Sequence, residues 1–217
     1  MGSQIQSDGK IRMSASLMNG NTQKFSGVIN IENVKNPIEV AQVLMKEDDR
    51  VLGGNGAKKY ATESGFEQYS TEIPQRRKEY EEKLKNGGKG TVGCVALDKN
   101  GSLAAATSTG GKGFELVGRI SDSATVAGNF ANKYCAVSCT GVGEDLVSNA
   151  TAAKMVTRVT DGLTLQNAFD RTFEELKEID GFAGAIGIDS EGNIFHQDSY
   201  PTIVFASFDG VDFEVFE

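Results

Sequence analysis

The chain of 217 residues is long enough for one ordinary domain, and 39% of its residues are hydrophobic, which suffices for a core. Its formal net charge of −8 argues against a nucleic-acid or anionic-membrane partner, because both require clustered Lys and Arg. No apolar stretch reaches the length of a membrane span, and the N-terminus lacks the apolar segment of a signal peptide. Three cysteines without metal-ligand spacing predict free thiols in the core and a cytoplasmic location.

His196 is the single histidine, which excludes any mechanism that requires two imidazoles. The sequence also lacks the Gly-x-Ser-x-Gly turn that presents a serine nucleophile. We therefore expect His196 to be structural or exposed. An enzyme built on this sequence needs a base other than histidine.

The first 90 residues alternate between strand and helix patterns. Strands are expected at 11–18 and 27–31, on either side of a turn at 19–21. Asn36 followed by Pro37 predicts the start of a helix, and a second short helix is expected after Gly56. The charged stretch 71–84 is compatible with a third helix. Residues 86–90 are polar and glycine-rich, which is typical of a linker.

From residue 91 onward the pattern is that of a core. A buried strand is expected at 92–97, and further strands at 103–107, 134–139, 183–189, 193–196, 202–208 and 213–216. Two helices are expected between them, at 145–159 and 164–179. Hairpins on both sides of a helical pair predict two mostly antiparallel sheets with helices outside.

The sequence changes abruptly at Gly90-Thr91, where the polar stretch meets an apolar strand. Glycine at position 90 permits the backbone angles that a strained, self-cleaving peptide needs. Cleavage there would give Thr91 both a hydroxyl nucleophile and a free α-amine, whose reference pKa of about 7.7–8.0 suits a general base. On this pattern alone, an ordinary strand that begins with threonine after a loop is the alternative.

Several further motifs extend along nearly the whole chain. They lie at residues 15–18, 36–38, 54–57, 90–98, 104–111, 118–123, 136–144 and 188–193. In order and spacing these motifs resemble the plant-type asparaginase / isoaspartyl peptidase family. Their combination is highly specific, and it supports the catalytic interpretation of Thr91.

The resemblance implies an α+β fold, a four-layer αββα sandwich of the N-terminal nucleophile hydrolase type with two mainly antiparallel sheets between helix layers. It implies a single domain over residues 1–217, which cuts itself between Gly90 and Thr91 into an α subunit, 1–90, and a β subunit, 91–217. The αβ units would form a homodimer. The family normally has a longer N-terminal part, including a strand that ends in His-Gly-Gly-Ala-Gly, so the N-terminal strand region is expected to be missing and the α subunit truncated.

The catalytic roles implied by the resemblance fall on four residues. Thr91 would attack the side-chain amide of L-asparagine or the isopeptide bond of a β-aspartyl dipeptide, and Thr109 would position it. Thr140 and Gly141 would form the oxyanion hole. The reaction implied uses no metal and no organic cofactor. As alternatives, Thr109 would be an ordinary strand-end residue and Thr140 would begin a glycine-rich turn.

Substrate binding is implied for Arg119, Asp122 and Gly143, together with the two oxyanion-hole residues. Arginine can grip a carboxylate with two parallel hydrogen bonds, and an aspartate suits the ammonium group of an amino acid. The alternative for Arg119 and Asp122 is a surface ion pair.

The sequence departs from the family pattern at a few positions. Ser14 and Asn19 replace aspartates, Ser121 and Ala124 replace a glycine and a proline, and residues 195–200 differ. Substrate preference therefore stays open. The competing hypotheses are a glycosylasparaginase-like amidohydrolase and a truncated, non-catalytic remnant of the family.

Overall fold

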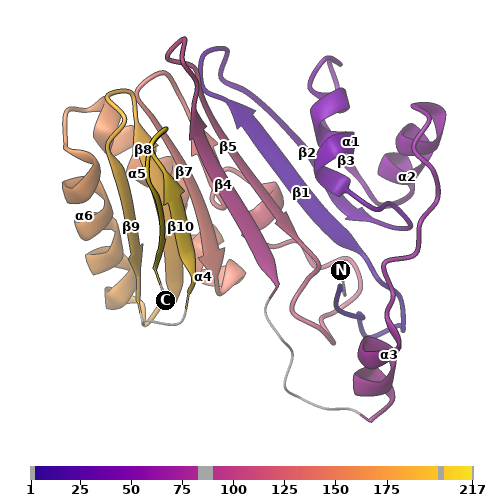
Figure 1. The fold of residues 1–217 in the computed structure, drawn as a ribbon. Coiled ribbons are helices and arrows are strands. Elements are labelled where there is room, and N and C mark those ends of the chain that lie inside the picture. Colours follow the sequence, from indigo (N-terminus) through magenta and orange to yellow (C-terminus); the bar gives the residue numbers. More distant parts are fainter. Residues whose placement is uncertain (1–2, 83–89, 200–202, 217) are drawn as a thin grey trace.

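The computed structural model describes residues 3–82, 90–199 and 203–216. Its larger sheet has the strand order β3-β2-β1-β5-β4 (Figure 1). These strands are β1 (Met13–Asn19), β2 (Lys24–Ile31), β3 (Val51–Gly53), β4 (Thr91–Leu97) and β5 (Leu103–Thr109). All neighbours are antiparallel except β2 and β3, which are parallel.

Two helices cover this sheet: α1 (Pro37–Leu44) packs against β1 and β2, and α2 (Gly54–Glu63) packs against β2 and β3. Their apolar side chains bury Ala15 and Val28 of the strands. The helix expected after Asn36 is confirmed, although the Asn36 side chain hydrogen-bonds to Glu39 rather than capping the backbone. A third helix, α3 (Pro74–Glu81), is shorter than the charged stretch that predicted it.

The second sheet has the order β6-β7-β8-β9, and it is antiparallel throughout. Its strands are β6 (Asn129–Ala131), β7 (Cys135–Gly141), β8 (Ala183–Asp189) and β9 (Ile194–Asp198). Helices α5 (Thr151–Thr160) and α6 (Leu165–Glu178) pack on one face of it. Thr164 caps α6 by accepting a hydrogen bond from the Asn167 amide.

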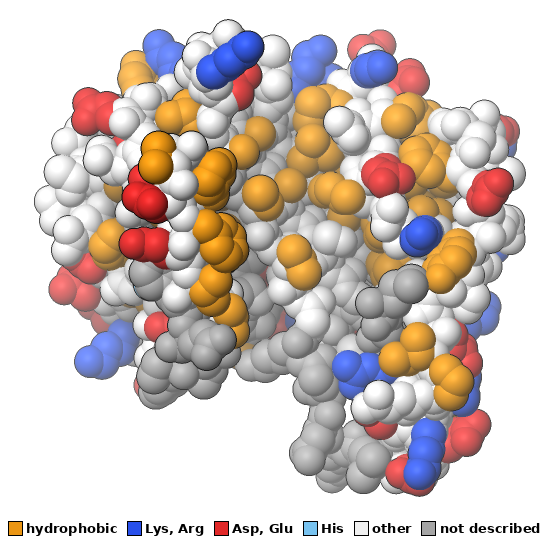
Figure 2. Space-filling view, viewed as in Figure 1, with side chains coloured by type: hydrophobic (Ala, Val, Ile, Leu, Met, Phe, Trp, Pro, Cys, Tyr) orange, Lys and Arg blue, Asp and Glu red, His pale blue; other side chains and the backbone are white. Residues whose placement is uncertain are grey.

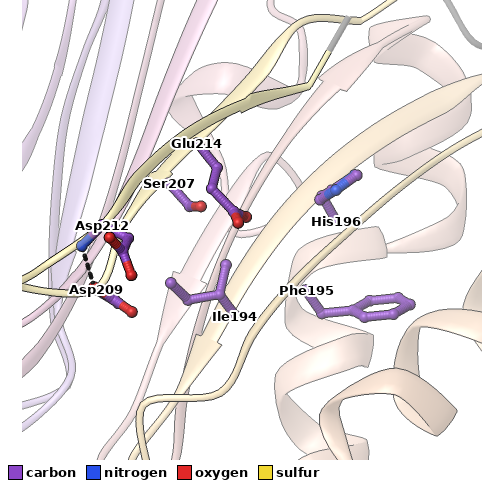
Figure 3. A pocket seen from close by; sticks show the side chains of 7 residues that line it. All are labelled: Ile194, Phe195, His196, Ser207, Asp209, Asp212 and Glu214. Atoms are coloured by element: carbon purple, nitrogen blue, oxygen red, sulfur yellow. Dashed lines mark hydrogen bonds between the residues drawn. The ribbon is translucent and has the colours of Figure 1, made fainter.

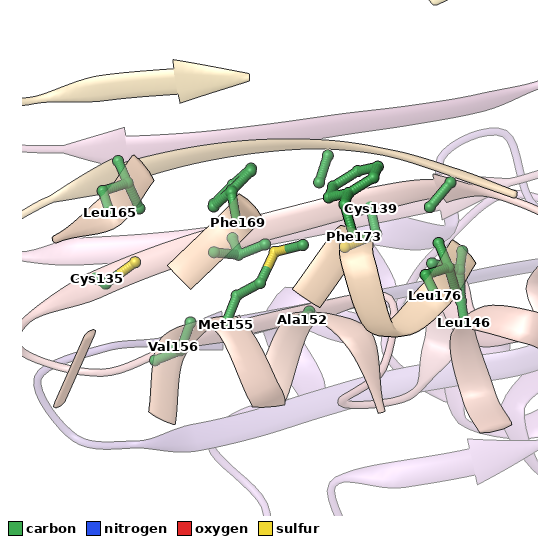
Figure 4. Packing of buried hydrophobic residues seen from close by; sticks show 13 residues of the cluster. Cys135, Cys139, Leu146, Ala152, Met155, Val156, Leu165, Phe169, Phe173 and Leu176 are labelled. Atoms are coloured by element: carbon green, nitrogen blue, oxygen red, sulfur yellow. The ribbon is translucent and has the colours of Figure 1, made fainter. Parts of the chain in front are cut away.

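The core under these helices is apolar and closely packed. Figure 4 shows Met155 of α5 and Phe169 of α6 pointing into the same space between helices and sheet. The ring of Phe169 lies directly on the backbone of Gly187 in β8, where a Cβ atom would be only 2.8 Å from it. Cys135 and Cys139 of β7 belong to this cluster, and burial raises the pKa of the Cys135 thiol to about 12.

The opposite faces of the two sheets contact each other, because β4 and β5 pack against β7. Small residues allow a close approach here. The Thr107 hydroxyl of β5 lies 2.7 Å from Ser138 Oγ of β7. Gly93 of β4 faces the same serine, and a Cβ atom at that position would overlap its hydroxyl.

Three sequence expectations prove wrong or incomplete. The helix predicted at 145–159 is two helices, α4 (Gly143–Asn149) and α5, because Ala150 takes a left-handed conformation with φ +50°. The strand at 92–97 is not buried. It lies at the edge of its sheet, and Val92 is 74% exposed. Cys94 on the same strand is exposed rather than part of the core.

The last two strands, β10 (Phe205–Phe208) and β11 (Phe213–Phe216), form a separate antiparallel hairpin. Several of its apolar side chains are exposed, including Phe208, Val211 and Phe213. In Figure 2 hydrophobic side chains are visible along this hairpin and over the neighbouring β4. Of the linker expected at 86–90, only Gly90 lies within the described residues.

Replacing Phe169 by alanine should lower the free energy of unfolding by about 3–5 kcal/mol, because a fully buried ring is lost and leaves a cavity. Urea denaturation in a Thr91→Ala background, where the chain is expected to stay uncut, measures this. Phe208→Ala is the matched control. Its ring is 64% exposed, so a change within about 0.5 kcal/mol is expected. Equal losses in both variants would contradict the packing described here.

Candidate active site

Strand alternation turns four threonines toward the space between the sheets. Thr107 and Ser138 face each other across this space, and side chains two residues apart in a strand share a face. Thr109 and Thr140 therefore face the same space. Thr91 pairs with Thr109 in the sheet, and the two hydroxyl oxygens are 3.2 Å apart. Thr91 and Thr140 line one pocket of about 310 Å³.

The peptide bond between Gly90 and Thr91 is held by the turn that follows β5. The Gly90 carbonyl oxygen lies 3.4 Å from the amide nitrogen of Gly110 and 3.5 Å from Thr109 Oγ. The Gly111 amide in turn donates to Thr109 Oγ at 3.2 Å. Thr109 thus touches both the hydroxyl of Thr91 and the carbonyl that precedes it. Donors on that carbonyl can stabilise negative charge as it develops on the oxygen.

Thr140 and Gly141 end β7 at the point where the chain turns into α4. Gly141 has φ +138°, and a Cβ atom there would overlap the Phe182 backbone, so only glycine fits. Thr140 is half-buried and lines the same pocket as Thr91.

Arg119 and Asp122 lie together beside Gly143, at the start of α4. A Cβ atom on Gly143 would be 2.8 Å from Asp122 Oδ1 and 3.1 Å from Arg119 Nη2, so glycine leaves room for both side chains. Neither residue lines the pocket shared by Thr91 and Thr140. The short segment from Thr140 to Gly143 connects the pocket of Thr91 and Thr140 with the pair formed by Arg119 and Asp122.

Asp122 is 4% exposed, and its Oδ2 has no hydrogen-bond partner among the described residues. Burial raises the pKa of this carboxyl from 3.8 to about 6. An unsatisfied buried carboxylate in a site of this kind is suited to receive a cationic group.

Arg119 forms a bidentate ion pair with Glu144, with Nε–Oε1 at 2.6 Å and Nη2–Oε2 at 2.8 Å. This contact lowers the pKa of Glu144 to about 2. The alternative of an ion pair for Arg119 is thus partly correct, but its partner is Glu144 and not Asp122. Sequence reasoning missed this role of Glu144, because 25 residues separate the partners and no local pattern joins them.

Glu115 is a second functional candidate that the sequence did not reveal. It is 4% exposed, its Oε2 has no partner among the described residues, and its Oε1 lies against Gly111. Its charge also helps to raise the pKa of Arg119, after the larger contribution of Glu144. A charged residue inside a glycine-rich loop gives little indication of burial before the fold is known.

Thr91 also lines a second and larger pocket, of about 520 Å³, at the end of the sheet near α1. A further pocket lies between β9 and the terminal hairpin, lined by His196 with Asp209, Asp212 and Glu214 (Figure 3). His196 stacks on Phe205 and lies in neither Thr91 pocket. No cluster of His, Cys, Asp or Glu in the described part of the chain is arranged to hold a metal ion.

Comparison with known proteins decides the family. The model of a family described as asparaginase matches residues 1–213. The chain belongs to the asparaginase family.

Relatives in this family align along most of the chain. An isoaspartyl peptidase/L-asparaginase of Nostoc sp. is 45% identical over 96% of this chain and 72% of its own length. A protein of the same name from Synechocystis sp. is 44% identical over 94% of this chain and 68% of its own. A plant-type L-asparaginase of Pyrococcus abyssi is 36% identical over 89% of this chain and 71% of its own length. Within the described part of this asparaginase-family chain, no helix is both long and apolar enough to cross a membrane.

Asp122→Asn should stabilise the protein at neutral pH. Because the pKa of Asp122 is raised from 3.8 to about 6 on folding, the folded protein binds the proton more tightly, and stability falls as pH rises between these values. The advantage of Asp122→Asn should therefore grow by roughly 2 kcal/mol between pH 4 and pH 7. Urea denaturation across this range, in a Thr91→Ala background, measures it.

Asp209→Asn is the matched control. Backbone hydrogen bonds from Asp212 and Val211 lower the pKa of Asp209 in an exposed turn, so its ionised form is favoured on folding. The stabilisation that the ionised Asp209 contributes is present above its unfolded pKa and is lost as pH falls. The stability difference between Asp209→Asn and its parent should therefore change with pH in the opposite direction to that of Asp122→Asn. A pH-independent difference for Asp122→Asn would contradict the burial described.

Proposed function

We propose that this chain is a self-processing threonine amidohydrolase that cleaves the side-chain amide of L-asparagine and the isopeptide bond of β-aspartyl dipeptides. The observation that carries the proposal is the convergence of Thr91, Thr109 and Thr140 on one space between the sheets. The same chain aligns along most of its length with proteins named isoaspartyl peptidase/L-asparaginase.

We also infer that the fold is the four-layer αββα sandwich of N-terminal nucleophile hydrolases, formed by one domain over residues 1–217. The contacts of α1 and α2 with one sheet, of α5 and α6 with the other, and of the sheets with each other support this inference. Cleavage after Gly90 would divide the domain into an α subunit, 1–90, and a β subunit, 91–217. A homodimer of αβ units, a cytoplasmic location and small-molecule substrates complete the proposal by resemblance to the family.

Self-cleavage begins at the Gly90 carbonyl. Thr91 Oγ attacks the carbonyl carbon, and the Gly110 amide and Thr109 hydroxyl lie near the oxygen on which negative charge develops. Breaking the C–N bond, with the hydroxyl proton passing to the nitrogen, leaves an ester between Gly90 and Thr91 Oγ and frees the α-amine of Thr91. Water then hydrolyses the ester, which gives a carboxylate at Gly90 and restores the threonine hydroxyl.

Substrate hydrolysis uses the same hydroxyl. The freed α-amine, with a reference pKa of about 7.7–8.0, accepts the proton of Thr91 Oγ as the oxygen attacks the substrate carbonyl. Thr140 Oγ and the Gly141 amide donate to the oxyanion, and the leaving amine takes the proton. Water hydrolyses the β-aspartyl ester. Arg119 binds the substrate carboxylate, Asp122 its ammonium group, and Gly143 keeps the space between them open.

Intact mass spectrometry of the purified chain tests the first step. The wild-type chain should give two fragments, 1–90 and 91–217, because Thr91 carries the attacking hydroxyl. Thr91→Ala should give one uncut mass, and Thr91→Ser, which keeps a hydroxyl, should still cleave. A folded wild-type chain that stays uncut would favour the non-catalytic remnant. Hydrolysis of GlcNAc-asparagine in place of β-aspartyl dipeptides would favour the glycosylasparaginase-like activity.

Thr140→Val should lower kcat for L-asparagine by about 10²- to 10³-fold with little change in KM, since it removes one oxyanion donor and keeps the shape of the side chain. Steady-state ammonia release measures both constants. Thr157→Val makes the same chemical change on an exposed face of α5, and it should leave them unaltered. An unchanged kcat in Thr140→Val would remove Thr140 from the oxyanion hole.

A further inference from the structure

The guanidinium of Arg119 is already held along one edge. Glu144 accepts hydrogen bonds from Nε and Nη2 at 2.6 and 2.8 Å, in the fork-like geometry that gives the strongest arginine–carboxylate contacts. If Arg119 binds the substrate carboxylate, two carboxylates must share one guanidinium. The position of Glu144 therefore bears directly on substrate binding.

The opposite edge of the guanidinium remains available. Arginine has five N–H donors, and a carboxylate on Nε and Nη2 leaves Nη1 and the second Nη2 hydrogen for another ligand. Among the described residues, the hydrogen bonds of the Arg119 side chain all go to Glu144 and none uses Nη1. The Arg119 side chain is 14% exposed, so part of it remains accessible to solvent.

Stability does not account for this ion pair. The Glu144 side chain is 51% exposed, and water screens exposed pairs until they contribute little to folding. Its place in the fold is more informative. Glu144 is the second residue of α4, directly after Gly143 and four residues after Thr140. The segment from Thr140 to Glu144 thus sets the relative positions of the proposed oxyanion donors, of Gly143, and of the carboxylate that holds Arg119.

We propose that Glu144 is a positioning residue, which orients Arg119 so that its Nη1 edge faces the α-carboxylate of the substrate. This proposal rests on the proposed function. Glu144 does not contact the substrate, and it acts by keeping the flexible arginine in one orientation before binding. Lys112, whose Nζ lies 3.4 Å from Glu144 Oε1, contacts the same carboxylate from the loop after β5.

The test compares Glu144→Gln with wild type in the self-cleaved protein. KM for L-asparagine should rise roughly tenfold or more while kcat changes less than about threefold, because the loss is one of ground-state carboxylate binding. Glu144→Asp, which keeps the charge, should recover part of the affinity. With 3-aminopropanamide, which is asparagine without its α-carboxylate, Glu144→Gln and wild type should have the same kcat/KM.

A binding measurement gives the same comparison without turnover. In calorimetric titration, Glu144→Gln should weaken the binding of L-aspartate and leave that of β-alanine, which lacks the α-carboxylate, unchanged. Glu191→Gln is the matched control. It removes the same charge in the turn after β8, at the opposite end of that strand from Ala183, the residue that pairs with Gly141.

The outcomes separate the two proposals. A wild-type chain that self-cleaves but neither hydrolyses nor binds these ligands contradicts the proposed function. If wild type is active, an unchanged KM in Glu144→Gln, or equal losses with and without the α-carboxylate, overturns the positioning role. A lower KM in Glu144→Gln would also overturn it, and would mean that Glu144 competes with the substrate for Arg119.

Discussion

Gly93 of β4 lies against Ser138 of β7, and beside it the Thr107 hydroxyl is 2.7 Å from Ser138 Oγ. This close approach of two sheets is the constraint on which the proposed site depends. Larger side chains would hold the sheets apart, because packed interiors leave no space for added atoms. With the sheets in contact, the alternation of each strand brings Thr91, Thr109 and Thr140 into one space.

Around the proposed binding residues, the requirements of stability and of ligand binding are opposed. Asp122 is buried, and one of its carboxylate oxygens has no partner among the described residues, so its charged form costs folding energy at neutral pH. Glu115 has an unpartnered buried oxygen as well. The hydrogen bonds to Glu144 raise the pKa of Arg119, and the charges of Glu115 and Asp122 add to this effect. A site kept unsatisfied in this way is suited to an amino-acid ligand, whose ammonium and carboxylate would complete the charge balance.

Local sequence signals predicted the elements that have strong periodicity and clear ends. Helix α6 follows its Thr164 cap and its apolar stripe, and strand β8 has the bounds expected from its apolar run. Where burial or backbone conformation depended on the tertiary structure, predictions from local sequence signals were wrong. The apolar residues of β4 predict a buried strand, but β4 is the last strand of its sheet and no described strand pairs with its outer edge. Nothing in the residues around Ala150 indicates that its backbone turns left-handed and ends α4.

For the candidate site, the sequence by itself determined the family, the Gly90-Thr91 junction, and which residue types are available as nucleophile and oxyanion donors, since these follow from motif order and from the single histidine. Only the tertiary structure decided that Thr91 and Thr109 touch, that Asp122 is buried, and that Arg119 is held by Glu144. The physical reason is that pairing between strands and the approach of two sheets bring together residues far apart in the chain. The strengths of these contacts depend on burial, which no local pattern encodes.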